Sequence, residues 1–171
     1  MDSLHGILLR MTLTAHAIVG AAVVATIPAH PVLGVCAAFA SHFLADAIPH
    51  YDYHIRSASI NPKVGGKITF DRALLLDFFS IGGDFALGMI LAILLFATPV
   101  TWWLVVAGAF AGTLPDALQF VYSKFKHEPL VSLQRFHKWI HTSVHMREHL
   151  MLGIVSQVFF LVAVVTAAKI L

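Results

Sequence analysis

The chain has 171 residues, of which 58% are hydrophobic and 12% charged, and its formal net charge is +2. A soluble domain is only about half apolar and about a quarter charged, so the composition excludes an ordinary soluble fold. The small net charge argues against a nucleic-acid partner, and the single cysteine, Cys36, excludes an intrachain disulfide. Residues 1–171 are therefore predicted to form one membrane-embedded domain.

Long apolar segments follow one another along the chain. Each is expected to be a helix, because lipid offers no partner to unpaired backbone groups. The segments cover residues 11–27, 31–48, 71–97, 101–122 and 150–171. The first two are short for full spans. The predicted fold class is all-α, a polytopic integral membrane bundle of about five transmembrane helices.

Basic residues predict the orientation of this bundle. Arg10 precedes the first helix, and most other Lys and Arg residues lie in the links 49–70 and 123–149. With five spans, the N-terminus and both links fall on one side, which the positive-inside rule assigns to the cytoplasm. The predicted location is a bacterial or archaeal inner membrane, with the N-terminus in the cytoplasm.

A weak internal repeat relates two of the apolar segments. Residues 37–47 resemble residues 107–117 at an offset of 70, and both stretches end in Asp-Ala after a run of small residues. Two readings account for the match. Either two pseudo-repeated helical hairpins precede a C-terminal helix, or apolar helices simply look alike in composition.

Ionisable residues inside the apolar segments are the main functional signal, because burying one in hydrocarbon costs about 3 kcal/mol or more. His42 and Asp46 are four residues apart, hence on one helix face. Asp116 ends the fourth segment after Pro115, which can bend the helix. Carboxylates and imidazoles together are typical ligands of divalent metals. The candidate metal ligands are His16, His42, Asp46, His50, Asp84, Asp116, His137 and His141.

Some of these residues have simpler interpretations. A lone histidine such as His16 is usually a hydrogen-bonded packing residue. Asp77 and Asp84 are seven residues apart on one face of the third helix. Asp84 is the deeper of the two, and it requires a metal, a histidine or a proton. The alternative is a protonated Asp84 carboxyl satisfied by a neighbouring helix.

Histidines recur every four residues at positions 137, 141, 145 and 149. Neighbouring pairs, His137 with His141 or His141 with His145, can bind one metal from a helix. Four histidines on one helix cannot all bind the same ion, so at least one is expected at the interface or outside the ligand shell. The alternative is an amphipathic helix on the membrane surface, with Lys138 touching lipid phosphates.

The first and third predicted helices begin at one membrane face, and the second and fourth end at that face. The polar groups of all four helices are therefore expected to converge there. Three short motifs in the chain resemble those of a known family. They are Thr14-Ala15-His16 with Gly20, then Leu114-Pro115-Asp116 or the stretch 44–50, and finally the stretch 137–143. This is the family of predicted membrane-bound, metal-dependent hydrolases, also described as LexA-binding and inner-membrane-associated. The histidine stretch lacks the family's Arg-Gly, which leaves open which residues bind metal.

The predicted function is metal-dependent hydrolysis of a lipid-linked phosphoester at the cytoplasmic face. The divalent metal is expected to be zinc, with manganese or magnesium next. Asp77 and His145 are the candidate bases, and Arg56, Arg135 and Lys138 are the candidate phosphate contacts. The expected partner is a membrane lipid or lipid-linked substrate. The alternatives are an ion- or proton-coupled transporter or channel, and a metal-stabilised membrane scaffold.

Overall fold

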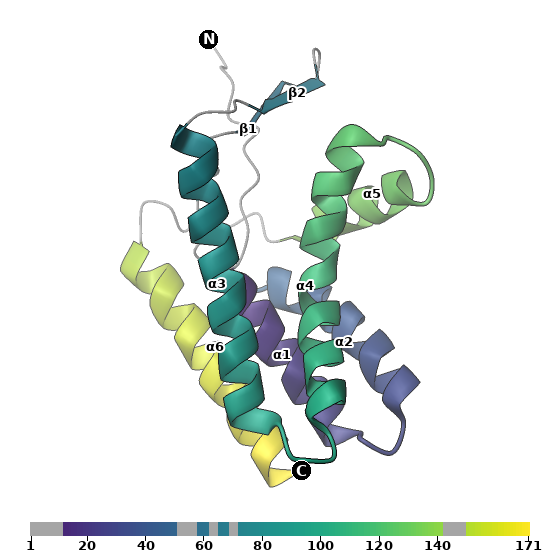
Figure 1. The fold of residues 1–171 in the computed structure, drawn as a ribbon, viewed down its shortest axis with the longest axis vertical. Coiled ribbons are helices and arrows are strands. Elements are labelled where there is room, and N and C mark those ends of the chain that lie inside the picture. The colour runs from purple at the N-terminus through teal and green to yellow at the C-terminus, as the bar shows by residue number, and fades with distance from the viewer. Residues whose placement is uncertain (1–11, 51–57, 62–64, 69–71, 142–149) are drawn as a thin grey trace.

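The computed structural model describes residues 12–50, 58–61, 65–68, 72–141 and 150–171. Within them it contains helices and one two-stranded antiparallel hairpin (Figure 1). The helices are α1 (Leu13–Thr26), α2 (Pro31–Asp46), α3 (Arg72–Phe96), α4 (Trp102–Lys124), α5 (Leu130–Ile140) and α6 (Leu150–Ile170). The strands are β1 (Ala58–Asn61) and β2 (Gly65–Ile68), with Ala58 opposite Ile68. The fold is therefore all-α apart from this hairpin, which the sequence did not predict.

Among the described residues, three helices, α3, α4 and α6, are long and apolar enough to cross a membrane, which indicates a membrane protein. The prediction of about five spans is wrong in number, because α1 has 14 residues and α2 has 16. At 1.5 Å per residue they are about 21 and 24 Å long, against a hydrocarbon core of about 30 Å. Prolines explain the short lengths. Pro28 follows α1, and Pro31 begins α2.

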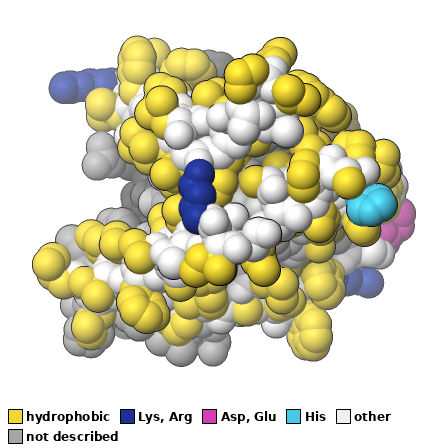
Figure 2. Space-filling model, turned by 90° about the horizontal axis from the view of Figure 1, so that it is seen from below, with side chains coloured by type: hydrophobic (Ala, Val, Ile, Leu, Met, Phe, Trp, Pro, Cys, Tyr) yellow, Lys and Arg dark blue, Asp and Glu magenta, His cyan; other side chains and the backbone are white. Residues whose placement is uncertain are grey.

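Helix α1 lies at the centre of the bundle and packs against α2, α3, α4 and α6. Its buried side chains are mostly small, and Ala17, Ala21 and Ala22 share a cluster with Ala92 of α3 and Ala109 of α4. The outer helices α3 and α6 expose large hydrophobic side chains along their lengths, as lipid-facing helices do. Figure 2 shows the end of the molecule that carries the C-terminus, where hydrophobic side chains predominate and few charged ones appear.

Glycines bring the backbones of α1 and α4 into contact. A Cβ atom added to Gly20 would clash with the carbonyl oxygen of Gly108, and one added to Gly112 would clash with the carbonyl oxygen of His16. Such small-residue contacts let helices approach closely in membranes. This contact holds His16 of α1 beside the part of α4 that carries Asp116. Helix α4 continues through Pro115 to Lys124, so the prediction that Asp116 ends this helix is wrong.

The first four helices form two antiparallel hairpins, α1–α2 and α3–α4, whose turns cover residues 27–30 and 97–101. Helix α1 ends at Thr26 and α3 ends at Phe96, an offset of 96 − 26 = 70 residues. If the two hairpins were a repeat, α1 would correspond to α3 and α2 to α4, so the contact of α1 with α4 would correspond to one of α3 with α2. The packing differs, because α1 packs extensively against α4, while α2 and α3 are not among the closely packed pairs. Internal duplication stays a prediction.

Helix α5 covers less of the histidine stretch than the four-residue spacing suggests. It ends at Ile140, with His141 as its C-terminal cap. Its buried face carries Gln134 and His137, while Trp139 is 78% exposed. Figure 1 shows α5 beside the end of α4 that lies away from the C-terminus. His145 and His149 lie outside the described residues.

Candidate metal centre

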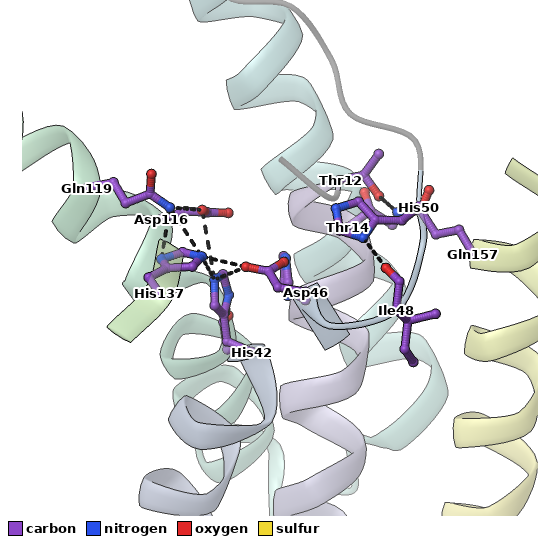
Figure 3. Close-up of polar contacts among 12 residues, drawn as sticks. Thr12, Thr14, His42, Asp46, Ile48, His50, Asp116, Gln119, His137 and Gln157 are labelled. Carbon is purple, nitrogen blue, oxygen red and sulfur yellow. Dashed lines mark hydrogen bonds and ion pairs between the residues drawn. The ribbon is translucent and has the colours of Figure 1, made fainter. Parts of the chain in front are cut away.

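The carboxylate of Asp46, the last residue of α2, is the hub of a buried polar cluster and is 2% exposed. Its Oδ2 lies 2.5 Å from Nε2 of His137 and 3.1 Å from Nε2 of His42, and its Oδ1 lies 3.2 Å from Nε2 of His16. These imidazoles come from α5, α2 and α1. Figure 3 shows His42, Asp46 and His137 pointing toward one another. Three elements therefore converge on a single carboxylate.

The orientation of His42 is fixed by a backbone group. Its Nδ1 donates to the carbonyl oxygen of Gly112 at 2.8 Å, so in the neutral ring the lone pair is on Nε2. That nitrogen faces Oδ2 of Asp46 at 3.1 Å and Oδ1 of Asp116 at 3.9 Å. A lone pair cannot hydrogen-bond a carboxylate, so a cation, either a proton or a metal ion, must lie between them. The carbonyl contact is also the kind that orients metal-binding histidines.

His16 gives the clearest evidence that a cation fits here. Its side chain is buried, its Nδ1 makes no hydrogen bond among the described residues, and its Nε2 has the 3.2 Å contact with Oδ1 of Asp46, which falls outside hydrogen-bond geometry. Its ring stacks on that of His42 with the centroids 3.9 Å apart. A buried imidazole without hydrogen bonds is costly. A metal ion bound at Nε2 would remove part of that cost.

Asp116 and Gln119, one turn apart on α4, complete this side of the cluster. Both side chains are buried. The Gln119 amide nitrogen donates to Oδ1 of Asp116 at 3.4 Å and lies 2.9 Å from Nδ1 of His137. Sequence analysis missed Gln119, although a polar residue three positions after Asp116 in an apolar helix was an available signal. The amide nitrogen donates, so in this arrangement Nδ1 of His137 accepts and Nε2 carries the proton that faces Oδ2 of Asp46. A metal at Nε2 of His137 would require the Gln119 side chain to turn its carbonyl oxygen toward Nδ1.

Three overlapping groups of these residues bring one possible ligand atom per residue to within 4.8 Å of one another, so the buried clusters could hold a metal ion. The groups are His16, His42 and Asp116; His42, Asp46 and His137; and Asp46, His50 and His141. Ligand bonds of about 2.0 Å place the corners of a zinc tetrahedron about 3.3 Å apart. In the group of His42, Asp46 and His137, two separations of 3.1 and 3.4 Å are close to that spacing. The third, 2.5 Å between Nε2 of His137 and Oδ2 of Asp46, is a hydrogen-bond distance, so these two atoms would have to move apart to bind one ion.

The three groups contain every predicted ligand except Asp84. Asp84 instead meets the first turn of α1. Its Oδ1 lies 2.7 Å from the Thr14 hydroxyl, and its Oδ2 accepts the Thr14 backbone N–H at 3.3 Å. A carboxylate in this position accepts a hydrogen bond from a backbone N–H at the start of the helix. Its negative charge is stabilised by the positive end of the helix dipole.

The remaining candidate residues are not part of the three groups or lie outside the described residues. Asp77 is buried in α3 but belongs to none of the three groups. Arg135 and Lys138 are exposed on α5. Arg56 and His145 lie outside the described residues, so their predicted roles as phosphate contact and base stay predictions.

No family model, curated protein or solved structure matches this chain. The chemistry of the site therefore rests on its own residues and their geometry.

Proposed function

We propose that the protein is a membrane-embedded, metal-dependent hydrolase. The observation that carries this proposal is the buried Asp46 carboxylate, which has Nε2 atoms of three imidazoles within 3.2 Å. Two histidines and one carboxylate are a common protein ligand set for catalytic zinc, in which a fourth position stays open to water. The group His42, Asp46 and His137 has this composition. The resemblance to membrane-bound, metal-dependent hydrolases supports the same reading.

Zinc is the proposed metal, with manganese and magnesium as the next choices, because imidazole nitrogens outnumber carboxylates in the cluster. A divalent ion at this position would polarise a scissile bond and make water a stronger nucleophile. The residues of the chain do the remaining work. The Gly112 carbonyl holds the ring of His42 in the orientation that turns Nε2 toward Asp46. The Gln119 side chain contacts the ring of His137, whose Nε2 also faces Asp46. Asp116 adds a second carboxylate beside His42.

A lipid-linked phosphoester is the proposed substrate class. Helix α5 supplies His137 from its buried face and exposes Arg135 and Lys138. Guanidinium and ammonium groups bind phosphate oxygens. The exposed Trp139 on the same short helix is a side chain favoured at the membrane–water interface. Substrate headgroups in the leaflet would therefore lie near the cluster, at the face that the basic links assign to the cytoplasm.

The test is phosphate release from phospholipids and polyprenyl phosphates by metal-loaded protein in detergent. Wild-type protein should release phosphate from at least one substrate, and Asp46→Ala should release none. His127→Ala is the matched control, because His127 is exposed in the link between α4 and α5 and belongs to none of the three groups. Absence of turnover across the panel, together with metal-dependent ion flux in liposomes, would replace the hydrolase with a transporter.

A further inference from the structure

The chain offers more metal ligands around Asp46 than one ion can bind. The three overlapping groups contain five histidines and two aspartates, whereas a zinc ion takes about four ligands. We infer that the site binds two divalent ions, with Asp46 bridging them and with His50 and His141 holding the second. The first ion is that of the proposed hydrolase, on which this inference rests.

His50 is oriented in the same way as His42. Its Nδ1 donates to the carbonyl oxygen of Ile48 at 2.6 Å, so the lone pair of the neutral ring is on Nε2. The side chain is 1% exposed, although it follows the end of α2. The preceding residue is fixed as well, because the Ser156 hydroxyl of α6 donates to the Pro49 carbonyl oxygen at 2.8 Å. His50 is therefore a preoriented ligand and not a solvated loop residue.

His141 reaches the same place from α5. As the cap of that helix, its backbone N–H donates to the carbonyl oxygen of His137 at 3.0 Å, which fixes it one turn after His137. The rings of His50 and His141 have centroids 5.3 Å apart, and those of His137 and His141 are 6.1 Å apart. One helix end thus supplies one imidazole to each proposed ion.

Asp46 is positioned to bridge the two ions. It is the one residue shared by the group with His42 and His137 and the group with His50 and His141. In the view of Figure 3, Asp46 lies between the His42–His137 pair and His50. A carboxylate has two oxygens, and each can bind a different cation. Two ions about 3.5–4 Å apart are the usual arrangement in two-metal hydrolytic sites.

A two-ion centre would also narrow the reaction class. Paired ions stabilise both the attacking and the leaving oxygen of an in-line displacement at phosphorus. Two-metal sites also occur in aminopeptidases, so the ligand set is compatible with a phosphoester substrate but selects it only together with Arg135 and Lys138.

The test is a titration of the metal-free, full-length protein in detergent with Co²⁺, followed by elemental analysis. Wild-type protein should bind two equivalents. His50→Ala and His141→Ala should each bind one, and the control His127→Ala should bind two. In a parallel sample loaded with Mn²⁺, magnetic coupling between neighbouring ions should broaden the six-line resonance of isolated Mn²⁺, and His50→Ala should restore that resonance.

One equivalent in wild-type protein, or two equivalents in both His50→Ala and His141→Ala, would overturn the two-ion site. If either variant unfolds, the manganese resonance of wild-type protein still decides, because isolated ions give the six-line signal. The proposed hydrolase fails separately. Two bound ions without turnover would support the two-ion centre and contradict the hydrolase. Turnover with one bound ion would support the hydrolase and contradict the two-ion centre.

Discussion

Nδ1 of His42 donates to the carbonyl oxygen of Gly112 at 2.8 Å, across 70 positions of sequence. The contact joins α2 to α4 and at the same time selects which nitrogen of His42 faces Asp46. Helix packing and ligand orientation therefore depend on the same residue of α4. Any residue would offer this backbone carbonyl, but only glycine fits here, because a side chain at position 112 would collide with the backbone of α1 at His16.

Gly112→Ala should lower the stability of the folded protein and its metal content together. The added methyl group would separate α1 from α4, and overpacking of this kind costs about 1–3 kcal/mol. Thermal unfolding in detergent and elemental analysis measure the two effects. Gly82→Ala is the matched control, because a Cβ atom at Gly82 meets open space. Equal melting temperatures for the two variants would contradict the close contact.

Removal of metal should destabilise wild-type protein but not Asp46→Asn. An ion that binds only the native state stabilises it by about 2.7 kcal/mol when its free concentration is 100 times the dissociation constant. The measurement is the shift in melting temperature when a chelator is added. Wild-type protein should melt at a lower temperature in the chelator, and the variant should show no shift. Identical shifts would mean that the ion is bound elsewhere.

Asp84→Asn should reduce stability without removing metal, because the Asp84 carboxylate meets Thr14 and belongs to none of the three groups. Loss of a charge at a helix N-terminus typically costs about 0.3–1 kcal/mol. Thermal unfolding and metal content should be measured on the same sample. Loss of metal in this variant would restore Asp84 as a ligand.

Gln119→Leu should weaken metal binding while leaving the fold intact. Its side chain contacts Nδ1 of His137 at 2.9 Å and would present its carbonyl oxygen to that nitrogen when Nε2 binds metal. Loss of such an orienting partner typically lowers metal affinity about 10- to 100-fold. Competition with a coloured chelator measures the affinity directly. An unchanged dissociation constant would show that His137 is held in place without Gln119.

The sequence predicted α3, α4 and α6 to within a few residues, because a long apolar run has few other stable forms in lipid. Their observed bounds are Arg72–Phe96, Trp102–Lys124 and Leu150–Ile170. The sequence shows that the first two segments, residues 11–27 and 31–48, are short for full spans, but the prediction of five spans includes them. The structure shortens them further, to 14 and 16 residues. Their lengths were set by the prolines at 28 and 31 and by the end of α2 at Asp46.

The candidate site was predictable for a similar reason, since an ionisable residue such as Asp46 in an apolar helix needs a partner. Asp84 satisfied the same rule but has a different partner, because Thr14 lies 70 positions away and only packing brings the two together. The four-residue spacing of histidines predicted ligands from α5. It could not show that the helix ends at Ile140 and turns His141 toward His50.

The most direct test of the account is the metal content of purified wild-type protein beside that of Asp46→Ala, with His127→Ala as the control. Asp46 is the residue on which the imidazoles of His16, His42 and His137 converge. Wild-type protein and the control should carry a tightly held divalent ion through purification, and Asp46→Ala should lose it. Metal-free wild-type protein that takes up no divalent ion on titration would contradict the account, as would undiminished metal in Asp46→Ala.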